Sequence, residues 1–278
     1  MATASINGVD LFYTEAGTGP PCLVMHGGLG MDHTLYKRSL GPLEDALHLV
    51  YYDQRGNGRS SRPPLETITI PQLAEDADAL REHLGIDRVA VIGHSYGGFV
   101  ALEYATTLSD RLSHLITLDT SPGAFEPTGG ELAERGDPSW ITPEVERALE
   151  AFSGPPPASD AEYESQLRQI MPAYLRSSST EVLSGLNDVI LDASAMVRGF
   201  EALDGWSVEP QLDQVGCPTL VLCGRYDLFT TPECSARIAS RIPGAELVWF
   251  ERSGHFPWLE EPDAFFAAVK GWLGRHPA

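Results

Sequence analysis

Short apolar runs alternate with helical patterns along most of this chain of 278 residues, and this alternation restricts the folds that it can adopt. Continuous runs of Val, Ile and Leu are typical of parallel strands that other elements cover on both faces. Because helical patterns separate the runs, we predict an α/β fold with a mostly parallel central sheet flanked by helices. The predicted strands are Cys22–Met25, Leu47–Tyr52, Val89–Ile92, Leu115–Leu118, Thr219–Cys223 and Leu247–Phe250.

The segments between these strands carry helical periodicity. In Pro71–Leu84, the residues Leu73, Ala77 and Leu80 fall on one face, as expected for a helix that packs against a sheet. The other helices predicted around the sheet are Gly97–Leu108, Pro232–Ser240 and Asp263–Leu273.

The amino terminus has the pattern of a hairpin. Asn7-Gly8 lies between the runs Ala2–Ile6 and Val9–Tyr13, and this pair supplies the positive φ angles that a two-residue turn needs. The segment has neither the basic start nor the apolar stretch of a signal peptide. We therefore expect a cytoplasmic protein.

The strand pattern stops between Ser121 and about Pro210. This stretch begins rich in Pro, Gly, Ser and Glu, and it includes Pro155-Pro156-Pro157. Helical patterns follow at Asp160–Tyr174 and Ser179–Leu191. A helical insertion between two strands of a sheet predicts a cap over the sheet edge. We therefore divide the chain into a core of residues 1–121 and 211–278 and a helical cap of residues 122–210.

The net charge is −20, from 39 acidic and 19 basic residues. Nucleic acids and anionic membranes are polyanions that such a surface repels, so we expect neither as a partner. No apolar run approaches the roughly 20 residues of a membrane-spanning helix. A small-molecule substrate is the partner that we expect, and the composition does not indicate an oligomeric state.

The four cysteines show no C-x-x-C spacing and no accompanying histidine pattern of a zinc site. We interpret Cys22, Cys217, Cys223 and Cys234 as small buried residues of the core. No metal site is therefore predicted, and no organic cofactor is expected.

The motif Gly93-His94-Ser95-Tyr96-Gly97 has the form G-x-S-x-G, and the predicted elements on either side of it indicate its structural role. A predicted strand precedes it and a predicted helix follows. A serine on such a sharp strand-to-helix turn holds its hydroxyl above the sheet, and the glycines leave room for the turn. We predict Ser95 as a catalytic nucleophile, with an ordinary glycine-rich turn as the alternative.

A serine hydroxyl needs a base to take its proton, and the base needs an acid to orient it. Asp227 and His255 each follow a predicted strand, at the sheet edge where Ser95 lies. We predict His255 as the general base and Asp227 as its acid, although Asp227 could instead cap the next helix and Asp119 is a rival acid. The histidines expected to face solvent are His33, His48, His83, His114 and His276.

The glycine-rich loop His26-Gly27-Gly28-Leu29-Gly30 follows the strand Cys22–Met25. Acyl hydrolysis builds negative charge on a carbonyl oxygen, which backbone N–H groups stabilise. We predict Gly28 and Tyr96 as the donors of an oxyanion hole, and His26 as a structural loop residue.

A second polar loop, Asp53–Ser60, follows the strand Leu47–Tyr52. Its glycines predict a compact loop in which Asp53 and Arg55 pair. The chain has no G-x-x-x-x-G-K-[ST] and no helix opened by G-x-G-x-x-G, so neither a nucleoside triphosphate nor a dinucleotide is indicated.

Together these motifs resemble the α/β-hydrolase superfamily, and specifically its proline iminopeptidase-like and esterase–lactonase branch. His26–Gly30 is similar to that branch's H-G-G-P-G, with Leu29 in place of proline, and Asp53–Ser60 matches D-Q-x-G-x-G-R-S. The resemblance implies a triad of Ser95, Asp227 and His255, an oxyanion hole and a helical cap.

Two departures from the iminopeptidase pattern bear on the substrate. Iminopeptidases hold the amino terminus of a peptide with carboxylates, one of which directly follows the triad aspartate, where this chain has Leu228 and Phe229. The ending Gly254–Pro262 also resembles esterases and lactonases. We expect the cap acids to be solvated charges, with one or two able to serve as amine ligands: Glu126, Glu181, Asp188, Asp192, Glu201 and Glu209.

The hypothesis is therefore a serine hydrolase that cleaves a small-molecule carboxylic ester or lactone through an acyl-enzyme on Ser95. The alternatives are a proline iminopeptidase-type aminopeptidase and a ligand-binding receptor that retains the fold. The predicted substrate-binding residues are Leu29, Trp140, Tyr174, Leu228, Phe229 and Phe256, and further apolar candidates in the cap are Phe152, Phe200 and Trp206.

Overall fold

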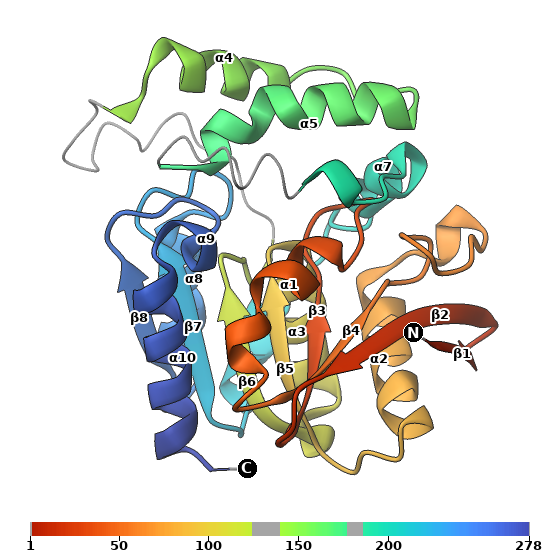
Figure 1. Cartoon of the computed structure of the whole chain (residues 1–278), viewed down its shortest axis with the longest axis vertical. Helices are drawn as coiled ribbons and strands as arrows, with labels where there is room; N and C mark the ends of the chain where they lie inside the picture. The colour runs from red at the N-terminus through yellow and green to blue at the C-terminus, as the bar shows by residue number, and fades with distance from the viewer. Residues whose placement is uncertain (1, 124–139, 177–185, 278) are drawn as a thin grey trace.

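The computed structural model describes residues 2–123, 140–176 and 186–277. Its centre is an eight-stranded sheet with the strand order β1-β2-β4-β3-β5-β6-β7-β8 (Figure 1). Strands β1 and β2 run antiparallel to their neighbours, and the remaining strands are parallel. The strands are β1 (Ala2–Ile6), β2 (Val9–Ala16), β3 (Pro21–Met25), β4 (His48–Tyr52), β5 (Val89–His94), β6 (Leu112–Leu118), β7 (Thr219–Gly224) and β8 (Glu246–Phe250).

These strands confirm the predicted mostly parallel sheet. The predicted hairpin is also confirmed, since Asn7 and Gly8 have φ angles of 47° and 75° between β1 and β2. The strands of the parallel part are apolar and buried, as their Val, Ile and Leu runs predict.

Helices cover both faces of the sheet (Figure 1). One apolar cluster joins the sheet to α2, α3 and α8, and a second joins its other face to α1 and α10. These helices are α1 (Thr34–Ser39), α2 (Ile70–His83), α3 (Tyr96–Thr107), α8 (Pro232–Arg241), α9 (Pro257–Glu260) and α10 (Pro262–Arg275). Short 3-10 turns lie at Gly41–Leu43, Leu65–Thr67, Ser109–Arg111 and Glu209–Gln214.

The parallel register places the carboxyl ends of the strands at one edge of the sheet. Met25 pairs with Gly93 and His94 with Leu118, while Gly224 pairs with Phe250. The loops that follow these positions therefore meet above the same edge, which is where open α/β sheets bind ligands.

Three further helices, α4 (Pro143–Phe152), α5 (Asp160–Tyr174) and α7 (Ala193–Glu201), lie across this edge at the top of Figure 1. The bounds predicted for α5 are confirmed, and its start is capped by Ser159, whose side chain accepts a hydrogen bond from the Glu162 N–H. The division into a core and a cap at residues 122 and 210 remains a prediction.

The predicted helix Ser179–Leu191 is wrong over its described part. Residues 179–185 lie outside the described residues, and only Leu186–Asp188 forms a short 3-10 turn. The backbone N–H groups of Ile190 and Asp192 instead bond the glycine-rich loop, at the Asp32 carboxylate and the Gly30 carbonyl. The chain therefore uses its donors in a tertiary contact rather than in a helix.

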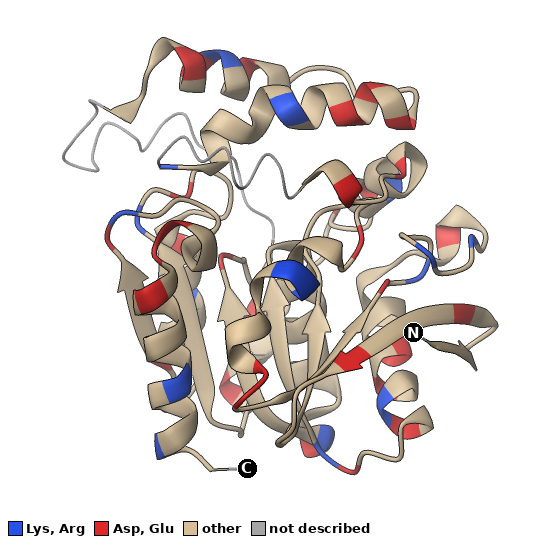
Figure 2. Cartoon of the chain, in the orientation of Figure 1, with Lys and Arg blue, Asp and Glu red and all other residues tan. Residues whose placement is uncertain are grey.

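Charge lies mainly outside the sheet. In Figure 2, Asp, Glu, Lys and Arg colour the helices and loops, whereas strands β3, β5, β6 and β7 carry none. All four cysteines are buried and unpaired, as predicted. No helix in the described ranges is long and apolar enough to cross a membrane.

Two histidines that we expected at the surface are buried. His33 lies against Asp53, with Nδ1 2.5 Å from the carboxylate. The ring of His114 packs edge-on against Trp272 and bonds the backbone carbonyl of His276. In both cases a partner from a distant segment satisfies the ring nitrogen, which removes the cost of burying it.

The predicted pair between Asp53 and Arg55 is wrong. Arg55 instead forms a buried bidentate ion pair with Asp76 on α2, at 2.6 Å and 2.8 Å. Asp76 also accepts hydrogen bonds from Asn7 and Gln72. This pair joins the polar loop to the hairpin and to α2.

Replacing Asp76 tests how strongly this pair supports the fold. In Asp76→Ala the buried Arg55 guanidinium loses its counter-charge, so we expect the free energy of unfolding to fall by about 3–5 kcal/mol. Urea denaturation followed by circular dichroism measures it. The control is Asp45→Ala, which removes an exposed pair with Lys270 and should cost less than about 1 kcal/mol. Equal losses in the two variants would contradict a structural role for the Arg55–Asp76 pair.

Candidate active site

Ser95 stands on a strained turn between β5 and α3. Its backbone angles are φ 51° and ψ −118°, a region that residues other than glycine rarely adopt. The turn depends on close backbone contacts, because a Cβ on Gly97 would lie 2.0 Å from the Met25 carbonyl oxygen. The glycines of the motif therefore allow α3 to start directly beside β3.

His255 and Asp227 are joined by a buried hydrogen bond. The imidazole Nδ1 lies 2.8 Å from the Asp227 Oδ2, and both side chains are nearly inaccessible to solvent. Asp227 is itself held by the N–H groups of Phe229 and Thr230 and by the Thr230 hydroxyl. An acid fixed in this way keeps the proton on Nδ1 and leaves Nε2 free to act as a base.

Ser95 and His255 line the same cavity. Among the described residues no hydrogen bond links the two side chains. Such bonds are often long in ligand-free enzymes and shorten when substrate binds.

Asp119, the rival acid, lies in the same cluster. Asp119, Asp227 and His255 each offer one polar atom within 4.8 Å of the others. His255 nevertheless takes Asp227 as its hydrogen-bond partner. Because the direct 2.8 Å contact between these two groups leaves no space for an ion between them, the cluster does not have the form of a metal site.

Of the predicted oxyanion donors, Gly28 lines the same cavity as Ser95, and Tyr96 directly follows Ser95 in the chain. Gly28 lines the cavity in a left-handed conformation, with a φ of 76°. Tyr96 is the first residue of α3, where the backbone N–H has no partner within the helix. Neither N–H donates a hydrogen bond to another described residue, so both are available to a ligand oxygen at the positive end of the α3 dipole.

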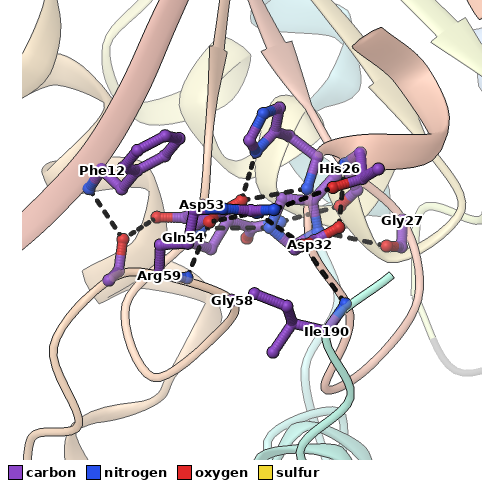
Figure 3. Close-up of polar contacts among 12 residues, drawn as sticks. Phe12, His26, Gly27, Asp32, Asp53, Gln54, Gly58, Arg59 and Ile190 are labelled. Atoms are coloured by element: carbon purple, nitrogen blue, oxygen red, sulfur yellow. Dashed lines mark hydrogen bonds and ion pairs between the residues drawn. The ribbon is translucent and has the colours of Figure 1, made fainter. Parts of the chain in front are cut away.

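A polar network fixes the glycine-rich loop (Figure 3). Gln54 donates its backbone N–H to the His26 ring and its side-chain amide to the His26 carbonyl. His26 thus has the structural contacts that were expected of it. Arg59 bridges Asp53 and Asp32, and Asp32 accepts a further bond from the Ile190 N–H.

Asp53 is the anionic centre of this network. Burial alone would raise its pKa, but the hydrogen bond and charge of His33 outweigh this effect and hold the pKa at about 2. The carboxylate therefore stays ionised at neutral pH and keeps its contacts with His33 and Arg59.

A second chain of hydrogen bonds joins three loops through His94. The Tyr36 hydroxyl accepts from the Gly27 N–H at 2.7 Å, so its own proton points to His94 Nδ1, 2.6 Å away. His94 Nε2 must then carry the ring proton, which it donates to the His255 carbonyl at 2.9 Å. Neutral His94 therefore connects the glycine-rich loop with the loop of the base. The sequence motif gives no indication of this role, because Tyr36 is distant in the chain.

The cavity has a volume of about 390 Å³ and a largely apolar lining contributed by the core and by α4, α5 and α7. Leu29, Tyr174 and Phe256 lie in its wall, as do Phe152 and Phe200. Other lining residues that the sequence did not identify are Met31, Leu35, Leu167, Ile170, Met171 and Met196. Apolar residues of this kind are equally typical of core packing, so the pattern alone could not identify them.

The other predicted substrate-binding residues lie outside this wall. Trp140, Leu228 and Phe229 form a separate apolar cluster under α4. Phe229 stacks on Tyr174, with ring centroids 3.8 Å apart. Trp206 packs on Phe99 and donates to Glu103. Of these side chains, Phe229 supports the cavity wall through its stacking on Tyr174.

Most of the cap acids that could hold an amine are engaged elsewhere. Asp188 pairs with Arg38, Asp192 with Arg62, and Glu209 with Arg237 and Arg241. Glu126 and Glu181 lie outside the described residues. Of the described carboxylates, Asp32 and Glu201 line the cavity.

Comparison with known proteins places the chain in a family. The family described as alpha/beta hydrolase fold matches residues 20–262. The proline iminopeptidase PfmaB of Pestalotiopsis fici is 30% identical over 96% of this chain and 97% of that protein.

Two solved structures are similar over nearly the whole chain. The enol-lactonase of Burkholderia xenovorans LB400 superposes with a TM-score of 0.78 and 26% identity, covering 98% of this chain and 100% of that one. A thermophilic esterase of Thermogutta terrifontis has a TM-score of 0.76 and 26% identity, covering 99% and 97%.

Neutral His94 makes stability depend on pH. Burial, and then the neighbouring His255, hold the pKa of His94 well below its usual range. An unfolded histidine takes up a proton below about pH 6.5, whereas folded His94 does not, so the free energy of unfolding falls as pH falls below that value. Urea denaturation at pH 5 to 8 should show a shallower fall in His94→Gln than in the wild type. His83→Gln, at an exposed site on α2, should keep the wild-type slope. A wild-type slope in His94→Gln would exclude a buried neutral His94.

Proposed function

The chain belongs to the α/β-hydrolase family, in the branch of proline iminopeptidases, esterases and lactonases, and we propose that it is a serine hydrolase of a small-molecule carboxylic ester or lactone. The observation that carries the proposal is the placement of Ser95 on a strained turn, at the same cavity as the His255–Asp227 pair. This combination of a hydroxyl in the cavity wall, a base and an orienting acid is what nucleophilic acyl transfer requires.

In the proposed mechanism the Ser95 hydroxyl attacks the substrate carbonyl, while His255 Nε2 takes the hydroxyl proton. Asp227 stabilises the imidazolium through Nδ1–H. The N–H groups of Gly28 and Tyr96 stabilise the tetrahedral oxyanion. The alcohol then leaves with the proton from His255, and a water activated by the same base hydrolyses the acyl-enzyme.

The cavity favours an uncharged substrate over a peptide amino terminus. An amine ligand needs a free carboxylate, but Asp32 is already bound by Arg59, and Glu201 lies on an exposed part of α7 beside Arg198. The position after Asp227 holds Leu228, which is buried in the apolar cluster under α4. The aminopeptidase alternative therefore lacks an unpaired buried acid in the described wall.

The receptor alternative does not account for the strain at Ser95. A strained backbone conformation of a residue other than glycine costs of the order of 1–3 kcal/mol, and such conformations concentrate at active sites. A protein that only binds its ligand does not need that conformation together with an oriented base.

Ser95→Ala tests the nucleophile. We expect the turnover of p-nitrophenyl esters to fall by ~10⁴ or more, because triad members act as a unit. The unfolding midpoint should stay close to that of the wild type. Ser240→Ala, at an exposed site on α8, is the matched control and should retain full turnover. Near-wild-type turnover in Ser95→Ala would refute the assignment.

A substrate panel tests the substrate class. We expect p-nitrophenyl esters with apolar acyl groups, or lactones, to be cleaved with a higher kcat/KM than proline p-nitroanilide, because the cavity wall is mainly apolar. A preference for the anilide would favour the aminopeptidase. A fluorophosphonate probe should label Ser95, and the absence of both labelling and turnover would favour the receptor.

A further inference from the structure

Asp119, directly after β6, is a second carboxyl group at the base of the proposed triad. It is completely buried, and its backbone has a φ of 42°. Asn and Asp tolerate this left-handed region better than most residues, but it remains uncommon and concentrates at functional sites. The conformation turns Asp119 toward the end of β7, where its Oδ1 accepts a hydrogen bond from the Gly224 N–H at 2.9 Å.

The other oxygen of Asp119 has no donor. Oδ2 is buried, and as a carboxylate oxygen it has no hydrogen-bond partner among the described residues. An ionised carboxylate left in this state costs several kcal/mol. The same oxygen is satisfied if it carries a proton and donates it to a neighbouring acceptor.

Asp227 provides that acceptor. The polar atoms of Asp119, Asp227 and His255 lie within 4.8 Å of one another, and the side chains of the two acids interact directly. Each of two buried carboxyl groups this close disfavours the ionisation of the other. Buried Cys223, on β7, also faces Asp119, and its thiol is a weak hydrogen-bond partner of the carboxyl group.

The surroundings decide which acid keeps the charge. Asp227 receives two backbone N–H groups, one hydroxyl and the His255 imidazole, all of which favour its anion. Asp119 receives one backbone N–H, from Gly224, and the weak thiol donor of Cys223. Burial, followed by the charge of Asp227, raises the pKa of Asp119 well above its usual range.

We propose that Asp119 is a positioning residue that keeps its proton in the resting enzyme, donates it in a hydrogen bond to Asp227, and becomes the partner of His255 when Asp227 is removed. When the Asp227 carboxylate is absent, Asp119 loses its proton to water, because the neighbouring negative charge that opposed its ionisation is gone. Its carboxylate then accepts the Nδ1–H of His255. The proposal rests on the proposed function in taking His255 as the base.

The first experiment is a double-mutant cycle on a p-nitrophenyl ester. Asp119→Val should lower kcat about tenfold with little change in KM, because Asp227 loses a donor and not the substrate site. Asp119→Asn should recover most of this loss, because an amide reproduces both hydrogen bonds of a protonated acid and tolerates the positive φ. Asp213→Asn, at an exposed position, is the control and should leave kcat unchanged.

If Asp119 replaces Asp227 as the partner of His255, the effects of the two substitutions on activity should not be additive. Asp227→Asn should keep at least tenfold more activity than Asp119→Asn/Asp227→Asn, and this remaining activity should rise with pH as Asp119 ionises. Equal activities of Asp227→Asn and the double variant would overturn the proposal that Asp119 replaces Asp227 as the partner of His255. A loss in Asp119→Asn as large as in Asp119→Val would mean that the position needs a charge, which would overturn the proposed protonation.

The charge state can be tested without catalysis. An unfolded aspartate ionises above about pH 4, whereas folded Asp119 keeps its proton, so this residue lowers the wild-type stability as pH rises. The stability of Asp119→Asn relative to wild type should therefore increase between pH 4 and 7 in urea denaturation. A constant difference would overturn the protonation. A rising difference in a protein without ester turnover would retain the protonation and reject the proposed function.

Discussion

A close approach between the first turn of α3 and the end of β3 governs the geometry around Ser95. A side chain at Gly97 would collide with the backbone carbonyls of Met25 and His26, and one at Gly93 would meet the Gly97 carbonyl at 2.5 Å. With glycine at both positions, the helix starts immediately after Ser95 and directs its positive end toward the glycine-rich loop. The strained turn at Ser95 and the position of the Tyr96 N–H at the start of α3 are therefore consequences of one packing constraint.

The helices over the sheet edge are part of this geometry, because their contacts reach the loops rather than the strands. The Tyr174 carbonyl at the end of α5 accepts the His255 N–H at 2.7 Å. On the other side, the Tyr163 hydroxyl bonds the Leu29 carbonyl, and the Asp192 N–H bonds the Gly30 carbonyl. The residues that shape the cavity thus hold both the loop of His255 and the glycine-rich loop. A change in α5 or α7 that alters the cavity therefore also affects these two loops.

The sequence was sufficient to predict the sheet, the hairpin and the elements that carry Ser95, Asp227 and His255, because each depends on a local pattern: an apolar run, an Asn-Gly pair, or a motif after a strand. The polar pairings could not be predicted in the same way. Arg55 selects Asp76 rather than Asp53 because α2 and the hairpin bring Asp76 to it, and sequence spacing does not encode that meeting. The cavity wall was only partly predicted, since Leu228 and Leu167 are indistinguishable as apolar residues until α4 and α5 are packed.

The acidity of the chain makes the charge state at the sheet edge important for the proposed mechanism. The net charge is −20, yet acyl transfer at Ser95 would create one more negative charge. Distant surface carboxylates are screened by salt, so the buried groups next to the reacting oxygen matter more. If Asp119 and Asp227 were both ionised, their combined field would oppose the oxyanion and bind the imidazolium too tightly for efficient proton return. A single negative charge on Asp227, held by donors from Phe229 and Thr230, stabilises the imidazolium while limiting that repulsion. A protonated Asp119 is therefore the state in which this edge of the sheet is electrostatically compatible with an oxyanion at Gly28 and Tyr96.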